Sequence, residues 1–408
     1  MLFFFLLQAI DILFAGNLVS PVDGSIEKDV YLHIQNEKII AITNEKPTSY
    51  RKFINLSSAY VLPGLMDAHT HLCWHINHRK NDGYVLSQVR EPTAYRAIQG
   101  VMNAKDMLLS GFTTVRDLGN AGLYADVSLR KSIEEELIIG PTIISSGPAI
   151  SPFGGQRWVI PERPDYNVPE YLYADTRDEI LKAIRKNIHF GATVIKIILG
   201  DQKYSYSVDD IRFIVEEAKK SGLKVAAHTS TDQTARDAIL AGVASIEHGF
   251  GMSDSTIKRL AKSQIPFVST TFSLPVLQSI QSDLSNPAEK DYRYGVELLK
   301  KCYEAGVFIA FGGDVIGKLK GYNRGEATLT FLKSFKDAGV SALHTLQALT
   351  INNAKTLGLE HSKGKLKTKY YADIIATKEN PLDNIFALND VHFVMKHGKI
   401  VKYENAEE

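Results

Sequence analysis

Short apolar runs alternate with longer amphipathic stretches from about residue 61 onward, and this alternation most restricts the possible fold. The amphipathic stretches at 209–221, 231–241, 254–263 and 292–305 are predicted as helices. The apolar runs are predicted as strands at 61–69, 113–117, 142–146, 193–199, 224–228, 244–247, 266–269 and 307–312. Strands that are apolar on both faces and alternate with helices form a parallel sheet covered on both sides. Eight such units over about 250 residues predict a (β/α)8 TIM barrel.

The competing fold is an open, doubly wound sheet. That fold usually carries a glycine-rich phosphate-binding turn after its first strand, and this sequence has none there. Two of the predicted helices are followed by Gly222 and Gly306, which can end a helix in the left-handed conformation. The barrel is therefore the preferred fold.

Both ends of the chain have the pattern of β-strands. Apolar runs lie at 9–13, 30–34 and 39–42 before the barrel, and at 372–376 and 392–396 after it, with turn residues between them. We predict that the two ends form one small β-sandwich. The expected divisions are 1–60 and 362–408 for the sandwich and 61–361 for the barrel, giving an α/β protein.

Composition excludes several classes of partner. The 47 Lys and Arg residues against 46 Asp and Glu give a net charge of +1, with no dense basic run, so no nucleic-acid partner is expected. Cys73 and Cys302 form no disulfide framework. No apolar run approaches the ~18 residues of a transmembrane helix, so no membrane partner is expected either. We expect a small-molecule or short-peptide substrate and a homo-oligomer.

The apolar first residues, MLFFFLL, resemble the core of a signal peptide. No Lys or Arg precedes Lys28, and Asp11 interrupts the run, which favours a buried strand. A cytoplasmic protein is expected, with export as the alternative if the run is the remnant of a signal segment.

His69 and His71 lie at the end of the first predicted barrel strand. Residues i and i+2 of a strand point to the same face, so two imidazoles one residue apart can hold one metal ion. Four further candidates lie in or after later strands: Lys196 in the fourth, His228 and His248 at the ends of the fifth and sixth, and Asp314 after the eighth. A barrel places its catalytic residues at these strand ends.

Each candidate has a structural alternative. His228 or His248 alone is more often a hydrogen-bonded histidine than a metal ligand, and Asp314 could cap a following helix. Lys196 could extend to solvent, but burying an unpaired charge in an apolar strand costs several kcal/mol. A lysine with a lowered pKa can instead add carbon dioxide and become an anionic carbamate.

The chain resembles the metal-dependent amidohydrolase superfamily, in the branch of imidazolonepropionase-related proteins, prolidase-like dipeptidases and zinc-dependent arginine carboxypeptidases. The matching stretches are LPGLMDAHTHL (62–72), GFTTVRDLG (111–119), VIKIILG (194–200), KVAAHT (224–229), ASIEHG (244–249), FGGD (311–314) and ADIIATKENPLDNI (372–385).

The resemblance implies two Zn²⁺ ions per chain. His69, His71 and Asp314 would hold the first and His228 and His248 the second, with N6-carboxylated Lys196 and a hydroxide bridging the two. Asp314 would also be the catalytic acid and base that takes the proton of the attacking water. Deaminases of the superfamily typically carry a Glu where this chain has Thr231, and they lack the bridging lysine, so hydrolysis of a C–N bond is the better fit.

The sequence constrains the identity of the substrate less than it constrains the metal ligands. Prolidase-like relatives often have Gly-Gly-His after the third strand and Tyr two residues after the fifth-strand histidine, whereas this chain has Gln156 and Ser230. These departures favour a C-terminal residue other than proline. The resemblance implies Arg or Lys, the other preference known in this branch, and so a carboxypeptidase or dipeptidase that releases one of them. The candidate acids for such a side chain are Asp201, Asp232 and Glu326, and the candidate donors for the α-carboxylate are Gln156, Arg157, Tyr204 and Asn323.

Other functions stay open. An Xaa-Pro dipeptidase, an N-acyl amino acid hydrolase and a cyclic-amide hydrolase are alternatives of the same class. A non-catalytic scaffold with the same fold is the alternative of another class, but such a protein should have lost ligands, and all six are present.

Overall fold

The computed structural model describes residues 10–76, 87, 90–156, 159, 161–163, 170–280 and 287–404. The chain divides into two compact units. The larger comprises 67–108 and 114–341, and the smaller comprises 1–66, 109–113 and 342–408.

The larger unit is the predicted barrel, and its strands form two sheets. The first has the order β5-β6-β7, and the second has the order β14-β13-β12-β11-β10-β8-β9, in which neighbouring strands are parallel. The strands are β5 (Leu65–Thr70), β6 (Phe112–Asp117), β7 (Thr142–Ser145), β8 (Ala149–Ser151), β9 (Tyr171–Tyr173), β10 (Ile195–Leu199), β11 (Val225–Thr229), β12 (Ser245–Glu247), β13 (Phe267–Ser269) and β14 (Ile309–Phe311).

The backbone also connects the last strand to the first. The amide of Asp314, just after β14, donates a hydrogen bond to the carbonyl of His69 in β5 at 2.7 Å. The eight predicted barrel strands are confirmed as β5, β6, β7 and β10 to β14.

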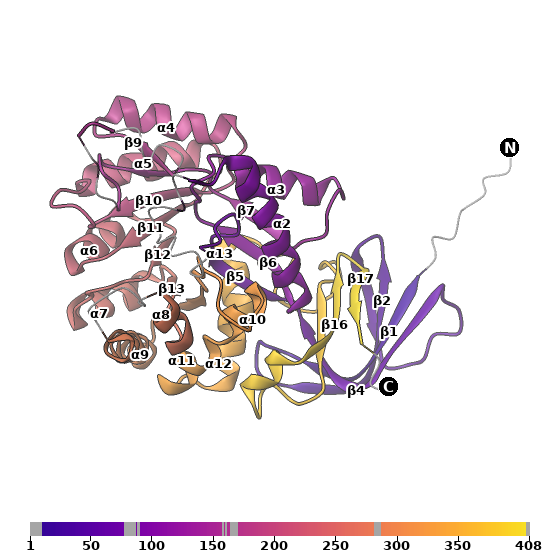
Figure 1. The fold of residues 1–408 in the computed structure, drawn as a ribbon. Helices are drawn as coiled ribbons and strands as arrows, with labels where there is room; N and C mark the ends of the chain where they lie inside the picture. Colours follow the sequence, from indigo (N-terminus) through magenta and orange to yellow (C-terminus); the bar gives the residue numbers. More distant parts are fainter. Residues whose placement is uncertain are drawn as a thin grey trace, which may run out of the picture. The chain divides into compact units, whose positions relative to one another are not determined.

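Helices follow the strands along the chain, and Figure 1 shows α4, α6, α7 and α9 on the outer side of strands β10 to β13. The four predicted helices are α5, α6, α7 and α9, and Gly222 and Gly306 adopt the expected left-handed conformation, with φ of 72° and 71°. The helices of this unit are α2 (Thr93–Leu109), α3 (Ala125–Glu134), α4 (Arg177–His189), α5 (Val208–Lys220), α6 (Asp232–Ala241), α7 (Asp254–Ser263), α8 (Leu274–Ile280), α9 (Ala288–Glu304), α10 (Arg324–Leu329) and α11 (Leu332–Asp337).

In the smaller unit, strands from both chain ends form one seven-stranded sheet with the order β17-β16-β15-β4-β1-β2-β3. One apolar core includes side chains near both edges of the sheet, such as Ile39 in β3 and Met395 in β16. The strands are β1 (Asp11–Val19), β2 (Ile26–Gln35), β3 (Lys38–Thr43), β4 (Lys52–Pro63), β15 (Ile374–Thr377), β16 (Val391–Lys396) and β17 (Lys399–Tyr403).

The unit boundaries differ from the expected ones after residue 341. The short helices α12 (Ala342–Gln347), η2 (Ala348–Asn352) and α13 (Asn353–Leu357) belong to the smaller unit. The side-chain amide of Gln347 donates a hydrogen bond to the carbonyl of Val22, just after β1, at 3.1 Å. These helices therefore pack with the strand-rich unit, although their sequence continues the helical pattern of the barrel.

The run predicted as one strand at 61–69 is two strands, because Gly64 interrupts the strand between the end of β4 and the start of β5. A Cβ atom at Gly64 would lie 2.2 Å from Oγ1 of Thr113, which no real contact allows. Glycine is thus the residue that permits this close crossing.

The first nine residues lie outside the described part of the chain, so the interpretation of MLFFFLL stays a prediction. Among the described residues, no helix has the length and apolar character needed to cross a bilayer.

Replacement of Gly64 by alanine should lower the free energy of unfolding by about 1–3 kcal/mol, because the new methyl group overpacks against Thr113. Thr113→Ala in the same chain removes the two nearest atoms and should restore part of this loss. Urea denaturation of both single variants and the double variant checks this. Strictly additive effects would contradict the crowding at this position.

Candidate active site

A cavity of about 580 Å³ lies in the larger unit, at the ends of the barrel strands. All six residues predicted as metal ligands line it: His69, His71, Lys196, His228, His248 and Asp314. Its walls also carry apolar side chains, among them Trp74, Phe250 and Ile316. The barrel therefore collects in one place six side chains that are far apart in the sequence.

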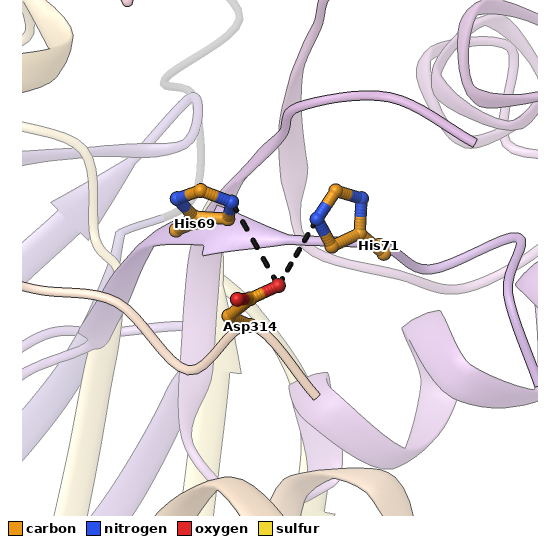
Figure 2. Close-up of side chains that lie close together, drawn as sticks. All are labelled: His69, His71 and Asp314. Carbon is orange, nitrogen blue, oxygen red and sulfur yellow. Dashed lines mark ion pairs between the residues drawn. The ribbon is translucent and has the colours of Figure 1, made fainter. Parts of the chain in front are cut away.

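His69, His71 and Asp314 form the tightest group, and their possible ligand atoms lie within 4.8 Å of one another. Figure 2 shows the two imidazoles facing the Asp314 carboxylate. Oδ1 of Asp314 lies 3.1 Å from Nε2 of His71 and 3.8 Å from Nε2 of His69. Two imidazoles and a carboxylate in this arrangement could hold one divalent ion.

The other two histidines extend this group into a row of four imidazoles. The ring centroids are 5.3 Å apart for His71 and His69, 4.7 Å for His69 and His248, and 4.5 Å for His248 and His228. The row follows from the parallel strands, because β11 and β12 are neighbours and bring His228 and His248 to the same end of the barrel.

Each imidazole has one ring nitrogen held by a protein acceptor. Metal-binding histidines typically have this arrangement, because the hydrogen bond at one nitrogen orients the ring and directs the other nitrogen at the ion. The contacts are His69 Nδ1 to Glu247 Oε2 at 2.8 Å, His71 Nδ1 to the Gly119 carbonyl at 2.5 Å, His248 Nδ1 to Thr270 Oγ1 at 2.7 Å and His228 Nε2 to Asp201 Oδ2 at 2.9 Å.

Lys196 lies within β10 and is 2% exposed, so its side chain does not extend to bulk solvent. Burial lowers the pKa of Lys196 to about 8, although the carboxylates of Glu247 and Asp314 favour the charged form. A lysine with such a pKa supplies the neutral amine that carbamate formation needs.

The protonation states of the cluster suit metal binding. Burial holds the pKa of His69 and of His248 well below the usual value, so both rings are neutral. The pKa of Asp314 lies below its usual value although burial alone would raise it, and in His71 the contact with Asp314 outweighs burial and raises the pKa of the imidazole. Metal ligands must be neutral imidazoles and ionised carboxylates. His69, His248 and Asp314 have these forms, and an ion bound at His71 would replace its proton.

Glu247 and Arg116 contribute to the site and were not identified from the sequence. Glu247 is fully buried, and its Oε1 accepts a hydrogen bond from Nη2 of Arg116 at 2.7 Å while Oε2 contacts His69. A charged residue inside an apolar strand was the feature that identified Lys196, and the same feature could have identified this pair.

Two candidate ligands have an unusual backbone conformation. His248 and Asp314 have φ values of 64° and 48°, in the left-handed region that side chains other than glycine seldom occupy. Oδ1 of Asp67 accepts from the amides of His69 at 2.9 Å and Gly313 at 3.0 Å, which fixes the turn before Asp314. Such conformations persist where the surrounding structure imposes them, often at functional sites.

The proposed substrate donors lie in different places. Gln156 lines the cavity, and its Oε1 accepts a hydrogen bond from the Tyr171 hydroxyl at 3.2 Å. Tyr204 is half exposed and donates to the carbonyl of Phe153, and Asn323 caps α10 in a reciprocal pair with Glu326. Neither of these two lines the cavity. Arg157 lies outside the described residues.

Of the proposed acids, Asp201 lines the cavity. Glu326 is the partner of Asn323 in the α10 cap, and Asp232 accepts hydrogen bonds from Ser253 and Arg236 on the outer helices. Their carboxylates satisfy local backbone and surface groups and do not line the cavity. Glu170, which was not predicted from the sequence, is 5% exposed and lines the cavity.

The donor set fits a metal ion. It consists of a carboxylate and imidazoles, each imidazole with one ring nitrogen in contact with a protein acceptor. The buried Lys196 completes it and has no ion pair among the described residues. This combination of nitrogen and oxygen donors suits zinc and similar divalent ions.

The model of the Amidohydrolase family matches residues 60–401 of this chain. The chain is 28% identical to an ochratoxinase of Aspergillus niger over 96% of this chain and 87% of that protein. It is 26% identical to an imidazolonepropionase of Fusobacterium nucleatum over 92% of each.

A solved structure of an Xaa-Pro dipeptidase with methionine bound in its active site is also similar. The TM-score is 0.84 at 26% identity, and the match covers 97% of this chain and 100% of the other.

Replacement of Glu247 by glutamine should destabilise the protein by about 3 kcal/mol, because the Arg116 guanidinium would keep its charge without a buried counter-ion. The matched control is Glu134→Gln, which breaks an exposed pair with Arg130 and should change stability by less than about 1 kcal/mol. Chemical denaturation measures both. Equal effects of the two changes would contradict the structural role of Glu247.

Proposed function

The chain belongs to the amidohydrolase family, and from this premise we propose that it hydrolyses the amide bond of a dipeptide or short peptide and releases a C-terminal Arg or Lys. The family supplies the reaction class, hydrolysis of amide bonds by a metal-dependent enzyme. The residue specificity is inferred from the charge of the cavity wall.

The observation that carries the specificity is the carboxylate of Asp201. It lies in the wall of the cavity, where Lys196 is the only Lys or Arg among the described lining residues. Glu170 adds a second carboxylate, but it interacts with the buried Arg96, whose pKa is lowered by burial and only partly restored by Glu91 and Glu170. Asp201 contacts His228 through Oδ2, and its other oxygen would pair with a substrate guanidinium or ammonium.

Metal binding is part of the proposal. His69, His71 and Asp314 would hold one zinc ion and His228 and His248 a second, with carboxylated Lys196 between them. When bound, zinc polarises the amide carbonyl and lowers the pKa of its water toward 7.

The residues of the chain have distinct roles in this proposal. Asp314 Oδ would accept the proton of the attacking water and return it to the nitrogen of the leaving amino acid. The Gln156 amide group would donate to the α-carboxylate, because Tyr171 holds its oxygen and its NH₂ lies beside His228, with which it has a long contact of 3.4 Å. Glu247 would keep His69 in the required tautomer.

One observation favours a second candidate, release of an apolar amino acid. Much of the cavity wall is apolar, and the similar Xaa-Pro dipeptidase structure holds methionine in its active site. An Xaa-Pro dipeptidase or an N-acyl amino acid hydrolase would suit such a wall, and the substrate screen below includes both.

Metal content tests the proposed ligands. After removal of metal by a chelator and reconstitution with zinc and bicarbonate, the protein should bind two zinc ions per chain, and Lys196→Ala should bind one or fewer. The exposed Lys333→Ala is the control and should bind as many ions as the unchanged protein. Fewer than one zinc ion in the unchanged protein would exclude the two-metal site.

Substrate preference tests the proposed reaction. In a screen of Xaa-Arg, Xaa-Lys, Xaa-Pro and Xaa-Met dipeptides and N-acyl amino acids, the basic dipeptides should have the highest kcat/KM. Asp201→Asn should lower kcat/KM for Xaa-Arg by roughly 10- to 100-fold, because a hydrogen bond to a charged group contributes about 1.5–3 kcal/mol, while Xaa-Met should change less.

The exposed Asp209→Asn is the control for this change and should behave like the unchanged protein. Metal content is measured in parallel, because Asp201 also contacts His228. Cleavage of Xaa-Pro with no cleavage of Xaa-Arg would make the proposed specificity wrong.

A further inference from the structure

A second cavity of about 310 Å³ lies beside the first, and the two share His248 and Phe250 in their walls. It is formed by the residues after β13 and by helices α8 and α9. Because a candidate metal ligand lies in the wall of both cavities, a group in the second cavity would be adjacent to the reacting amide.

The surface of the second cavity is suited to an apolar group. Phe250, Phe272, Leu277 and Leu298 form its apolar wall, and Asp291 is the one carboxylate among the described residues that line it. Its hydroxyl groups have partners within the protein. Thr270 contacts His248 Nδ1 at 2.7 Å, Thr271 contacts Ser269 at 2.8 Å, and Tyr294 accepts from the amide of Gly251 at 2.7 Å.

A glycine in the middle of α9 keeps space open on this side. Gly295 lines the cavity, and a Cβ atom there would lie 3.2 Å from Cγ2 of Thr271. Glycine inside a helix costs roughly 0.5–1 kcal/mol relative to alanine. The residue is thus unfavourable for the helix, but it leaves the wall of the cavity open.

The position of the cavity indicates which half of a substrate it takes. Gln156 and Asp201 lie on the side of the imidazole row formed by the residues after β8 and β10, whereas the second cavity lies beyond His248 on the β13 side. The two halves of an amide extend in opposite directions from its carbonyl carbon. If the amino acid half lies at Gln156 and Asp201, the acyl half points toward β13.

We propose that the cavity lined by Phe250, Phe272, Leu277, Gly295 and Leu298 is the binding site for the acyl half of the substrate and takes a bulky apolar or aromatic group. This inference rests on the proposed amide hydrolysis and adds to it a preference on the other side of the cleaved bond. The adjacency of the two cavities, which share His248 and Phe250 in their walls, supports this occupant.

The test uses substrates with one leaving amino acid, the one released best in the dipeptide screen, and three acyl groups: acetyl, butanoyl and 3-phenylpropanoyl. The unchanged protein should cleave the 3-phenylpropanoyl substrate with a kcat/KM roughly 10-fold or more above that of the acetyl substrate, because the ring buries additional apolar surface. Leu277→Trp fills the cavity and should lower this ratio at least 10-fold.

Leu240→Trp is the control, because Leu240 is exposed on α6 and lines neither cavity, and it should leave the ratio unchanged. Gly295→Ala is the second test variant. It narrows the same cavity while favouring the helix, so a folding defect in Leu277→Trp would not obscure the result.

The outcomes separate the two proposals. Cleavage of all three substrates at equal efficiency, or an equal loss on all three in both cavity variants, would overturn the acyl site while leaving amide hydrolysis intact. No cleavage of any substrate by the metal-loaded protein would refute the proposed function, and the acyl site with it.

Discussion

The buried carboxylate of Glu247 joins three strands of the barrel, and the candidate site depends on it. From β12 it accepts hydrogen bonds from Ser245 and from Arg116 of β6, and it contacts His69 of β5. Arg116 in turn donates to the carbonyl of Ala68 at 2.6 Å, so its guanidinium is hydrogen-bonded to both a carboxylate and a backbone carbonyl. An ion pair taken out of water is tolerated only with such complete hydrogen bonding. Glu247 also contacts the ring of His69. The carboxylate that neutralises the buried Arg116 therefore also orients a candidate metal ligand.

A second constraint acts where the barrel closes. Asp67 links the amides of His69 and Gly313, and the backbone of Asp314 pairs with that of His69. A Cβ atom at Gly313 would lie 2.6 Å from Oδ2 of Asp67, so any larger residue at this position would clash with that carboxylate. Closure of the barrel therefore places the Asp314 carboxylate beside the two imidazoles of β5. Asp is among the residues that tolerate the left-handed conformation, and these long-range contacts hold Asp314 in it.

The two cavities give the site an asymmetric environment. The side near β8 and β10 carries Gln156, Glu170 and Asp201, which are polar or acidic, whereas the side near β13 is mainly apolar. A substrate with a charged amino acid half and an apolar acyl half would match both sides. In the amidohydrolase family, to which this chain belongs, the barrel and its histidines supply the common chemistry, and loops and helices around the strand ends determine what is bound.

The amino-acid sequence by itself was sufficient to predict the eight barrel strands, four of the surrounding helices and the six side chains that meet in the cavity. Those predictions rest on local periodicity and on charged or imidazole groups at strand ends, and the backbone imposes both over a few residues. Tyr204 and Asn323 lie outside the cavity lining, because polar loop residues often satisfy nearby backbone groups, as they do here. Glu247, the break at Gly64 and the apolar second cavity were decided only by the tertiary structure. Each depends on contacts between residues distant in the chain, such as Arg116 with Glu247 or Gly64 with Thr113, and no local pattern encodes those distances.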